Sequence, residues 1–232
     1  MTPLSPAEWE IIGLSLRVTV VAIALTLPVA YCTAWLLARG RFPGRFLLDA
    51  VVHLPLVLPP VVTGYVLLLL FGRNGPIGGL LDQLFGVSLT FSWTGAALAA
   101  AIMALPLMVR AMRLSIEAVD RRLIGAARSL GARPWRAFVT ITLPLSLPGI
   151  LAGAVLGFAR SIGEFGATVT FVANIPGETR TLPLAIYNAL QIPGTDIQIA
   201  RLAVISVLLS LGALLLSEWL VRRSAGENAH VV

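Results

Sequence analysis

The sequence predicts an all-α integral membrane protein, and three observations lead to this class. Of the 232 residues, 57% are hydrophobic and only 12% are charged, whereas an ordinary soluble domain carries about 25% charged residues. The apolar residues are gathered in long uncharged blocks rather than alternating with polar residues. One long amphipathic passage rich in arginine, Asp120–Pro148, interrupts this apolar pattern.

Five uncharged blocks are the candidate membrane spans. Four of them contain 19 to 23 residues, enough to cross about 30 Å of hydrocarbon, and the last contains 16. The blocks are Val18–Ala38, Ala50–Phe71, Phe91–Val109, Ala137–Ala159 and Leu202–Ser217.

Two further apolar segments, Phe165–Gly177 and Thr181–Thr195, are too short and too interrupted to span comfortably. We expect them to be interfacial or re-entrant, which is tolerated where protein or a water-filled cavity covers the backbone. Five crossings are therefore expected. If both segments crossed the membrane, the total would be seven, and each terminus would stay on the side that five crossings give it.

The arginines predict the topology, because basic residues are enriched in cytoplasmic loops. All 17 basic residues are arginine, and 12 of them lie in loops or tails on one side of the predicted spans. This bias places the N-terminus in the periplasm and the C-terminus in the cytoplasm. The 12 are Arg39, Arg41 and Arg45, then Arg110, Arg113, Arg121, Arg122, Arg128, Arg133 and Arg136, then Arg222 and Arg223.

The composition also excludes several kinds of site. Without lysine the chain cannot form a Walker A phosphate loop, so ATP would have to be hydrolysed by another chain. A single cysteine, Cys32, and two distant histidines give little basis for a metal site. The net charge of +6 lies beside membrane segments and indicates topology rather than nucleic-acid binding. We expect no catalytic residues, no metal and no cofactor bound by this chain.

The amphipathic passage predicts a helix, a sharp turn and a second helix. Asp120 is a favourable N-cap residue, and Gly131 is placed to end the helix in a left-handed conformation. Pro134 suits the first turn of the next helix. The helix carries Leu123, Ala126, Ala127 and Leu130 at helical spacing. On amphipathicity alone, a surface helix solvated by its arginines is an equally good interpretation.

The same passage resembles the "EAA" signature of permease subunits in bacterial ABC importers, E-A-A-x3-G-x9-I-x-L-P. Every fixed position matches except the first, where Gly125 stands in place of glutamate. The resemblance implies that loop 110–136 holds a coupling helix, which docks into a groove on a separate ATPase subunit. The matching residues are Ala126, Ala127, Gly131, Ile141, Leu143 and Pro144.

A second polar group lies near the outer end of the fourth block. Arg160 and Glu164 stand four residues apart, and an ionisable pair near membrane depth is a candidate functional site. The alternative is a mutual salt bridge at the interface. Hydroxyls and exposed amides around the pair suit the passage of an oxyanion, and the candidate pathway residues are Arg160, Ser161, Glu164, Gly166, Thr168 and Thr170.

A stripe of small residues, Gly149, Gly153, Gly157 and Ser161, precedes this pair on the fourth block. Such a stripe permits close helix packing and also suits a pore-lining face.

The segments HLPLVLPPVVTGYVLLL, beginning at His53, and ARSIGEFGATVTFVANIPGETRTLPLAIY, beginning at Ala159, together with the coupling loop, resemble molybdate ABC transporter permeases across nearly the whole chain. This resemblance implies one type I importer transmembrane domain over residues 1–232, with its core at about 11–221, in the bacterial inner membrane. It also implies a homodimer with two cytoplasmic ATPase subunits that bind ATP-Mg, and a periplasmic molybdate-binding protein.

Other functions remain open at this stage. The GEFGA element is also similar to sulfate permeases, so sulfate, tungstate or a related oxyanion is an alternative cargo. A secondary transporter commonly shows internal repeats and midplane charges, neither of which is evident here. A membrane enzyme would favour clustered acids, histidines or cysteines, whereas the 11 acidic residues are scattered.

Overall fold

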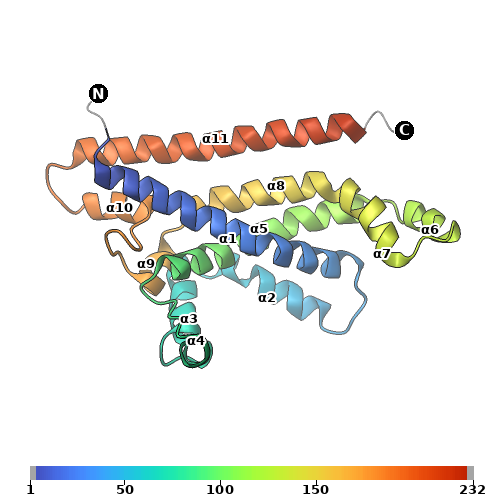
Figure 1. Ribbon diagram of the computed structural model, residues 1–232, viewed down its shortest axis with the longest axis horizontal. Coiled ribbons are helices and arrows are strands. Elements are labelled where there is room, and N and C mark those ends of the chain that lie inside the picture. Colours follow the sequence, from blue (N-terminus) through green and yellow to red (C-terminus); the bar gives the residue numbers. More distant parts are fainter. Residues whose placement is uncertain (1–3, 229–232) are drawn as a thin grey trace.

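The computed structural model describes residues 4–228, with side chains except those of residues 217, 218 and 220–228. All the regular structure in this range is helical, which confirms the predicted class. Helices α1, α5 and α11 run along the length of an elongated bundle in one direction and α2 and α8 in the other, while α3 projects across it (Figure 1). The elements are α1 (Pro6–Arg39), α2 (Arg45–Val57), α3 (Pro60–Phe71), α4 (Pro76–Phe85), α5 (Trp93–Ala118), α6 (Arg121–Ser129), α7 (Pro134–Ala137), a π-helical segment (Phe138–Thr142), α8 (Leu143–Ile162), α9 (Gly166–Val172), α10 (Leu182–Ala189) and α11 (Asp196–Asn228).

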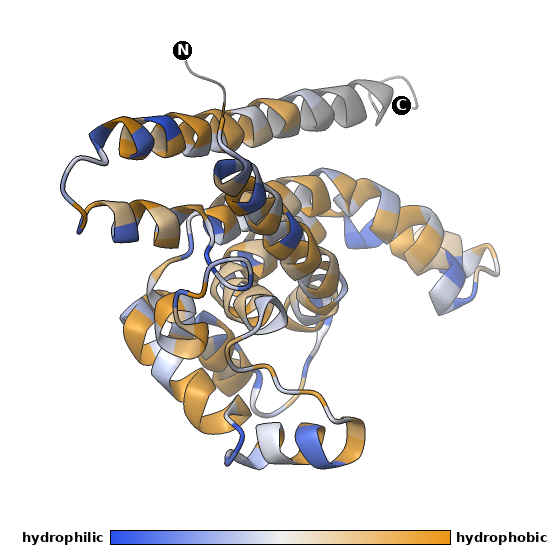
Figure 2. Cartoon of the chain, turned by 60° about the vertical axis from the view of Figure 1, so that its left-hand side comes forward, coloured by the Kyte–Doolittle hydropathy of each residue, from blue (hydrophilic) through white to orange (hydrophobic). Residues whose placement is uncertain are grey.

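Helix α5 is the centre of the bundle and packs against α1, α8, α9 and α2. Small residues line its contact with α8, where a Cβ added at Gly149 would overlap Ser115 and one at Gly157 would lie 2.6 Å from Met108 Sδ. The glycine stripe therefore serves helix packing, and the pore-lining interpretation of these glycines is wrong. Apolar residues also cover much of the outside of the bundle, as expected of helices that face lipid (Figure 2).

The second predicted block, Ala50–Phe71, is not one straight span. The structure breaks it between Val57 and Pro60 into α2 and α3, which are bent by 118° relative to each other. Pro59 and Pro60 explain the break, because neither can donate the backbone hydrogen bond that would continue the helix. Leu58, which precedes a proline, is extended at φ −71° and ψ 141°.

Within the described residues, four helices are long and apolar enough to cross a membrane, and the α2–α3 pair makes a fifth if it acts as one broken span. The four are Pro6–Arg39, Trp93–Ala118, Pro134–Ile162 and Asp196–Leu216. The last begins six residues before the predicted block and contains 21 residues, enough to cross the membrane. The two short apolar segments form α9 and α10, of seven and eight residues, and neither is long enough to span.

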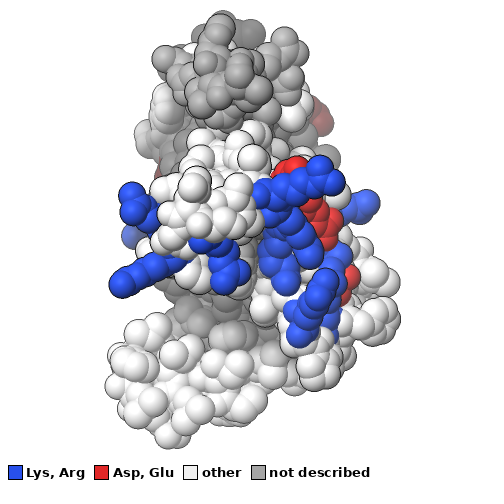
Figure 3. All heavy atoms as spheres, turned by 90° about the vertical axis from the view of Figure 1, so that its right-hand side faces the viewer, with Lys and Arg blue, Asp and Glu red and all other residues white. Residues whose placement is uncertain are grey.

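One end of the bundle is rich in arginine (Figure 3). The Gly40 loop, the α6–α7 turn and the late part of α11 all lie at this end, while the beginning of α1 lies at the other (Figure 1). This arrangement has the parity expected from an odd number of crossings. Arg222 and Arg223 belong to α11, but their side chains lie outside the described residues.

Candidate functional site

Helix α6 is a short helix with defined ends at the arginine-rich end of the bundle. Asp120 is its N-cap, since the carboxylate accepts a hydrogen bond of 2.8 Å from the Arg122 amide. Gly131 follows the helix with φ +88°, in the left-handed region. The Ala132 amide donates to the Ala127 carbonyl and the Gly131 amide donates to Arg128, which together form a Schellman motif. Both predicted ends are confirmed.

Every residue of α6 is exposed or half-buried, so this helix packs little against its own chain. Leu123 is 49% exposed and Leu130, just beyond the helix, is 90% exposed. Gly125 and Ala126 are exposed as well, and Ala127 is half-buried. Apolar side chains held outward on a capped helix form a surface suited to a protein partner.

The second half of the motif lies elsewhere. Ile141 is half-buried in the π-helical segment, and Leu143 begins α8 and packs against the core cluster that contains Tyr31 and Met112. Pro144 is exposed in the first turn of α8. The structure therefore divides the motif residues between an exposed helix and the beginning of a span.

Arg39, at the end of α1, fixes the connection that leads into α6. Its Nη2 donates hydrogen bonds of 2.8 Å to the carbonyls of Ile116 and Val119 at the end of α5. A cation at a helix C-terminus also interacts favourably with the helix dipole. From the sequence, Arg39 was only a topology signal, because its partners lie 77 and 80 residues further along the chain.

A charged cluster joins α2 to α5 at the same end. Arg113 lies 3.1 Å from Asp49 Oδ1 and 2.9 Å from Glu117 Oε1, and His53 Nδ1 lies 3.3 Å from Asp49 Oδ1. Together with Arg110 and Leu114, these side chains border a cavity of about 330 Å³. This cluster was missed, although Asp49 and His53 at helical i, i+4 spacing were a signal for it.

The predicted pair of Arg160 and Glu164 does form an ion pair. Glu164 follows the end of α8 and is 3% exposed, and its Oε1 accepts a hydrogen bond of 2.8 Å from the Ala167 amide. The carboxylate therefore holds the beginning of α9 as well as Arg160. The salt-bridge interpretation is confirmed, while a role in a pathway stays a prediction.

The other candidate pathway residues surround this pair and are largely packed. Ser161 is buried, and its hydroxyl donates to the Ala100 carbonyl at 3.4 Å. Thr168 is buried, and the Thr170 hydroxyl donates to the Gly166 carbonyl at 2.9 Å. A Cβ at Gly166 would lie 2.7 Å from Pro60, so α9 and α3 approach closely there. The half-buried members of the group are Arg160, Gly166 and Thr170.

Comparison with known proteins identifies the family. Residues 18–226 match the family described as "Binding-protein-dependent transport system inner membrane component". The chain belongs to this family. It is accordingly a multi-pass inner membrane protein and a transport subunit.

The similar curated proteins of this family are permeases. The chain is 58% identical over 221 residues to the molybdenum transport system permease protein ModB of Escherichia coli strain K12, covering 95% of this chain and 96% of that protein. It is 60% identical over 216 residues to ModB of Haemophilus influenzae, covering 93% and 94%. It is 36% identical over 219 residues to the sulfate transport system permease protein CysW of Synechocystis, covering 93% and 79%.

Two solved transporters of the ABC class share the fold. A bacterial ABC transporter involved in the import of alginate matches with a TM-score of 0.74 at 18% identity, covering 95% of this chain and 80% of that chain. The MetNI methionine ABC transporter matches with a TM-score of 0.69 at 17% identity, covering 94% of both. These likenesses confirm the expected fold of a type I importer transmembrane domain.

Proposed function

We propose that this chain is the membrane permease of an ATP-driven importer that carries molybdate. The observation that carries the proposal is the identity of 58–60% with molybdenum permeases over 93–95% of the chain. The lower identity of 36% to a sulfate permease favours molybdate over sulfate. Sulfate and tungstate are the alternative cargoes, because they share the charge and tetrahedral shape of molybdate.

The exposed α6 supports coupling to a separate ATPase. In this proposal, one ATPase subunit docks on the surface formed by Leu123, Ala126, Ala127 and Leu130, and Gly131 sets the direction of the helix. ATP-Mg binds to the ATPase, and this chain contributes no catalytic residue. Movement of the ATPase then reaches α8 directly, since α6 contacts both α7 and the π-helical segment at the beginning of that span.

The assembly in this proposal is a homodimer of one-domain permeases with two ATPases and a periplasmic molybdate-binding protein. The arginine-rich end faces the cytoplasm, so the N-terminus is periplasmic and the C-terminus cytoplasmic. The anion passes near Arg160, Ser161, Glu164, Gly166, Thr168 and Thr170. Among these, Arg160 supplies positive charge, and its side chain is 25% exposed beside the buried Glu164.

Uptake of labelled molybdate tests this proposal. Cells without their own molybdate importer should gain ATP-dependent uptake when they express this chain with its ATPase and binding protein. Unlabelled tungstate and sulfate, added in equal excess, rank the competing anions. The variant Ala127→Asp, which places a charge in the docking surface, should insert normally but lose both ATPase co-purification and uptake. Normal uptake by this variant with the ATPase bound would show that α6 is not the coupling element.

A further inference from the structure

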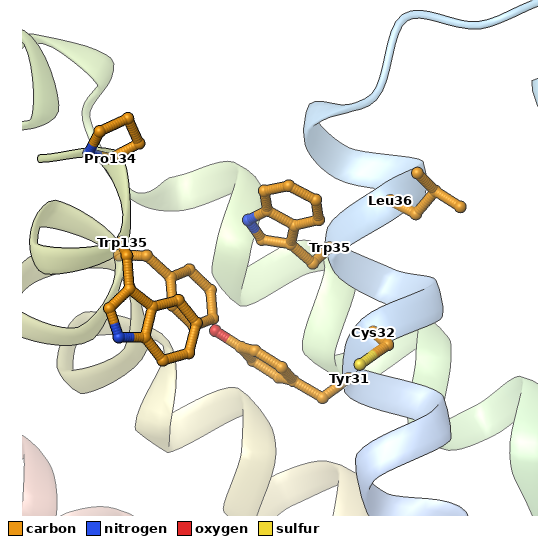
Figure 4. A pocket seen from close by; sticks show the side chains of 7 residues that line it. Tyr31, Cys32, Trp35, Leu36, Pro134 and Trp135 are labelled. Atoms are coloured by element: carbon orange, nitrogen blue, oxygen red, sulfur yellow. The ribbon is translucent and has the colours of Figure 1, made fainter.

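An aromatic groove lies between α1 and α7 at the arginine-rich end. It encloses about 530 Å³ and is lined by Tyr31, Cys32, Trp35, Leu36, Pro134, Trp135 and Phe138. Tyr31 and Trp35 extend from α1 toward Trp135 on the other side (Figure 4). The Phe138 ring lies 5.4 Å from the Trp135 ring and 6.1 Å from those of Tyr31 and Trp35, so it forms the floor that joins the two helices.

The groove lies where the apolar spans end. Trp35 is one helical turn before Arg39, the last residue of α1, a rise of about 6 Å. On the other wall, Trp135 lies between Arg133 and Arg136. Tryptophan is enriched at this level of a bilayer, because its ring is apolar while its N–H can donate to a polar group. Trp135 is 73% exposed and Trp35 is 42% exposed, so both rings present substantial free surface.

The charges divide the site into two parts. The seven described side chains that line the groove are uncharged, while Arg133 and Arg136, which flank Pro134 and Trp135 in the sequence, are exposed. A guanidinium binds a phosphate through two parallel hydrogen bonds, which makes arginine a favourable phosphate ligand. A basic pocket between spanning helices is a known way of holding an anionic lipid headgroup.

We propose that this groove binds an anionic phospholipid, with an acyl chain between Trp35 and Trp135 and the phosphate at Arg133 and Arg136. The site is separate from the proposed anion pathway and does not depend on which anion is carried. Because Trp135 belongs to α7, which directly follows the α6 turn, the bound lipid stabilises the position of α7 against α1.

Tryptophan quenching by brominated lipid tests the proposal. The full-length chain, with any subunits that purify with it, is placed in nanodiscs of phosphatidylcholine with a minority of phosphatidylglycerol. Two samples are compared, one with brominated acyl chains on phosphatidylglycerol and one with them on phosphatidylcholine. Both samples contain the same mole fraction of brominated lipid. The fluorescence of Trp35 and Trp135 is obtained as the emission of the unaltered chain minus that of the variant Trp35→Phe/Trp135→Phe, and this difference is the groove signal. Brominated phosphatidylglycerol should quench this signal with an enrichment of roughly tenfold over its bulk share, because two arginines attract its headgroup.

The charge variants complete the test. Arg133→Gln/Arg136→Gln should reduce the enrichment to the bulk share, whereas Arg73→Gln, in the α3–α4 turn away from the arginine-rich end (Figure 1), should leave it unchanged. Native mass spectrometry should show fewer retained phosphatidylglycerol molecules on the double variant. Equal quenching by both lipids would indicate an ordinary lipid-facing surface and overturn the proposal. Weak quenching by both would show that a second copy or an ATPase covers the groove, and would overturn it as well.

Discussion

The guanidinium of Arg39 lies 2.8 Å from the carbonyl oxygen of Val119, so the end of α1 holds the residue from which the chain turns into α6. A second bond to Ile116 makes the contact two-pronged. Arg39→Gln should lose most of this contact, and each hydrogen bond to a charged group contributes roughly 1.5–3 kcal/mol. We expect normal insertion but a lower uptake of anion and weaker retention of the ATPase. Arg41→Gln, an exposed neighbour, is the matched control, and an equal loss of uptake in both variants would contradict a specific role for Arg39.

Gly131→Val should misdirect α6 without unfolding the bundle. The residue has φ +88°, and a β-branched side chain in that conformation costs roughly 1 kcal/mol or more. Gly131→Asn is the control, since asparagine tolerates the left-handed region. Uptake measured beside an ATPase pull-down should fall sharply for valine and much less for asparagine. If valine and asparagine behave alike, the backbone conformation at this turn is not what coupling requires.

Gly149→Ala should destabilise the folded bundle. The added Cβ would overlap Ser115 on α5, and overpacking of this kind costs about 1–3 kcal/mol. Gly212→Ala is a matched control, because a Cβ at that position has open space around it. Thermal unfolding in detergent can be monitored by the loss of the folded peak in size-exclusion chromatography. The midpoint temperature of unfolding should be lower for Gly149→Ala alone. Equal midpoints would mean that α5 and α8 are less closely packed than described.

Arg160 and Glu164 can be separated into structural and transport roles by a double-variant cycle. Arg160→Gln leaves the buried Glu164 carboxylate unpaired, which costs about 3–5 kcal/mol, whereas Glu164→Gln leaves only the half-buried Arg160 unpaired and costs less. The double variant removes both charges and should fold better than either single variant, yet fail to take up molybdate. Normal uptake by the double variant would leave the pair with a structural role only.

Cysteine labelling tests the orientation. In a Cys32→Ala background, a single cysteine at Asn74 should react with an impermeant reagent from the periplasm, and one at Ser129 should react only from the cytoplasm. The arginine distribution is the physical basis of this expectation. The reverse labelling pattern would place α6 outside the cell and exclude its contact with an ATPase.

Features that depend on neighbouring residues, such as the ends of α6, could be predicted from the sequence. Asp120 and Gly131 mark the ends of α6 because capping depends on residues within a few positions of each other. The bend at Pro59 and Pro60 also depends on neighbouring residues. It was not predicted, because the uncharged length of Ala50–Phe71 favoured a single span.

Contacts between distant segments were the part that could not be predicted. Glu8 is 1% exposed and pairs with Arg201 across α1 and α11 at 3.0 Å, although nearly two hundred residues separate them. Similarly, hydroxyls at Ser161 and Thr170 suited an anion by type, but only the folded chain shows that both donate to backbone carbonyls.

The π-helical segment Phe138–Thr142 sets the rotational phase between α7 and α8. Its wide turn is closed by the Leu143 amide donating to the Phe138 carbonyl, five residues back, and α8 begins directly after it at Leu143. The extra residue in a wide turn offsets everything after it by about 100° from a regular α-helix. Because of that offset, Trp135 can face α1 while Gly149 faces α5. Helical periodicity is therefore continuous within α7 and within α8, but not across the boundary between them.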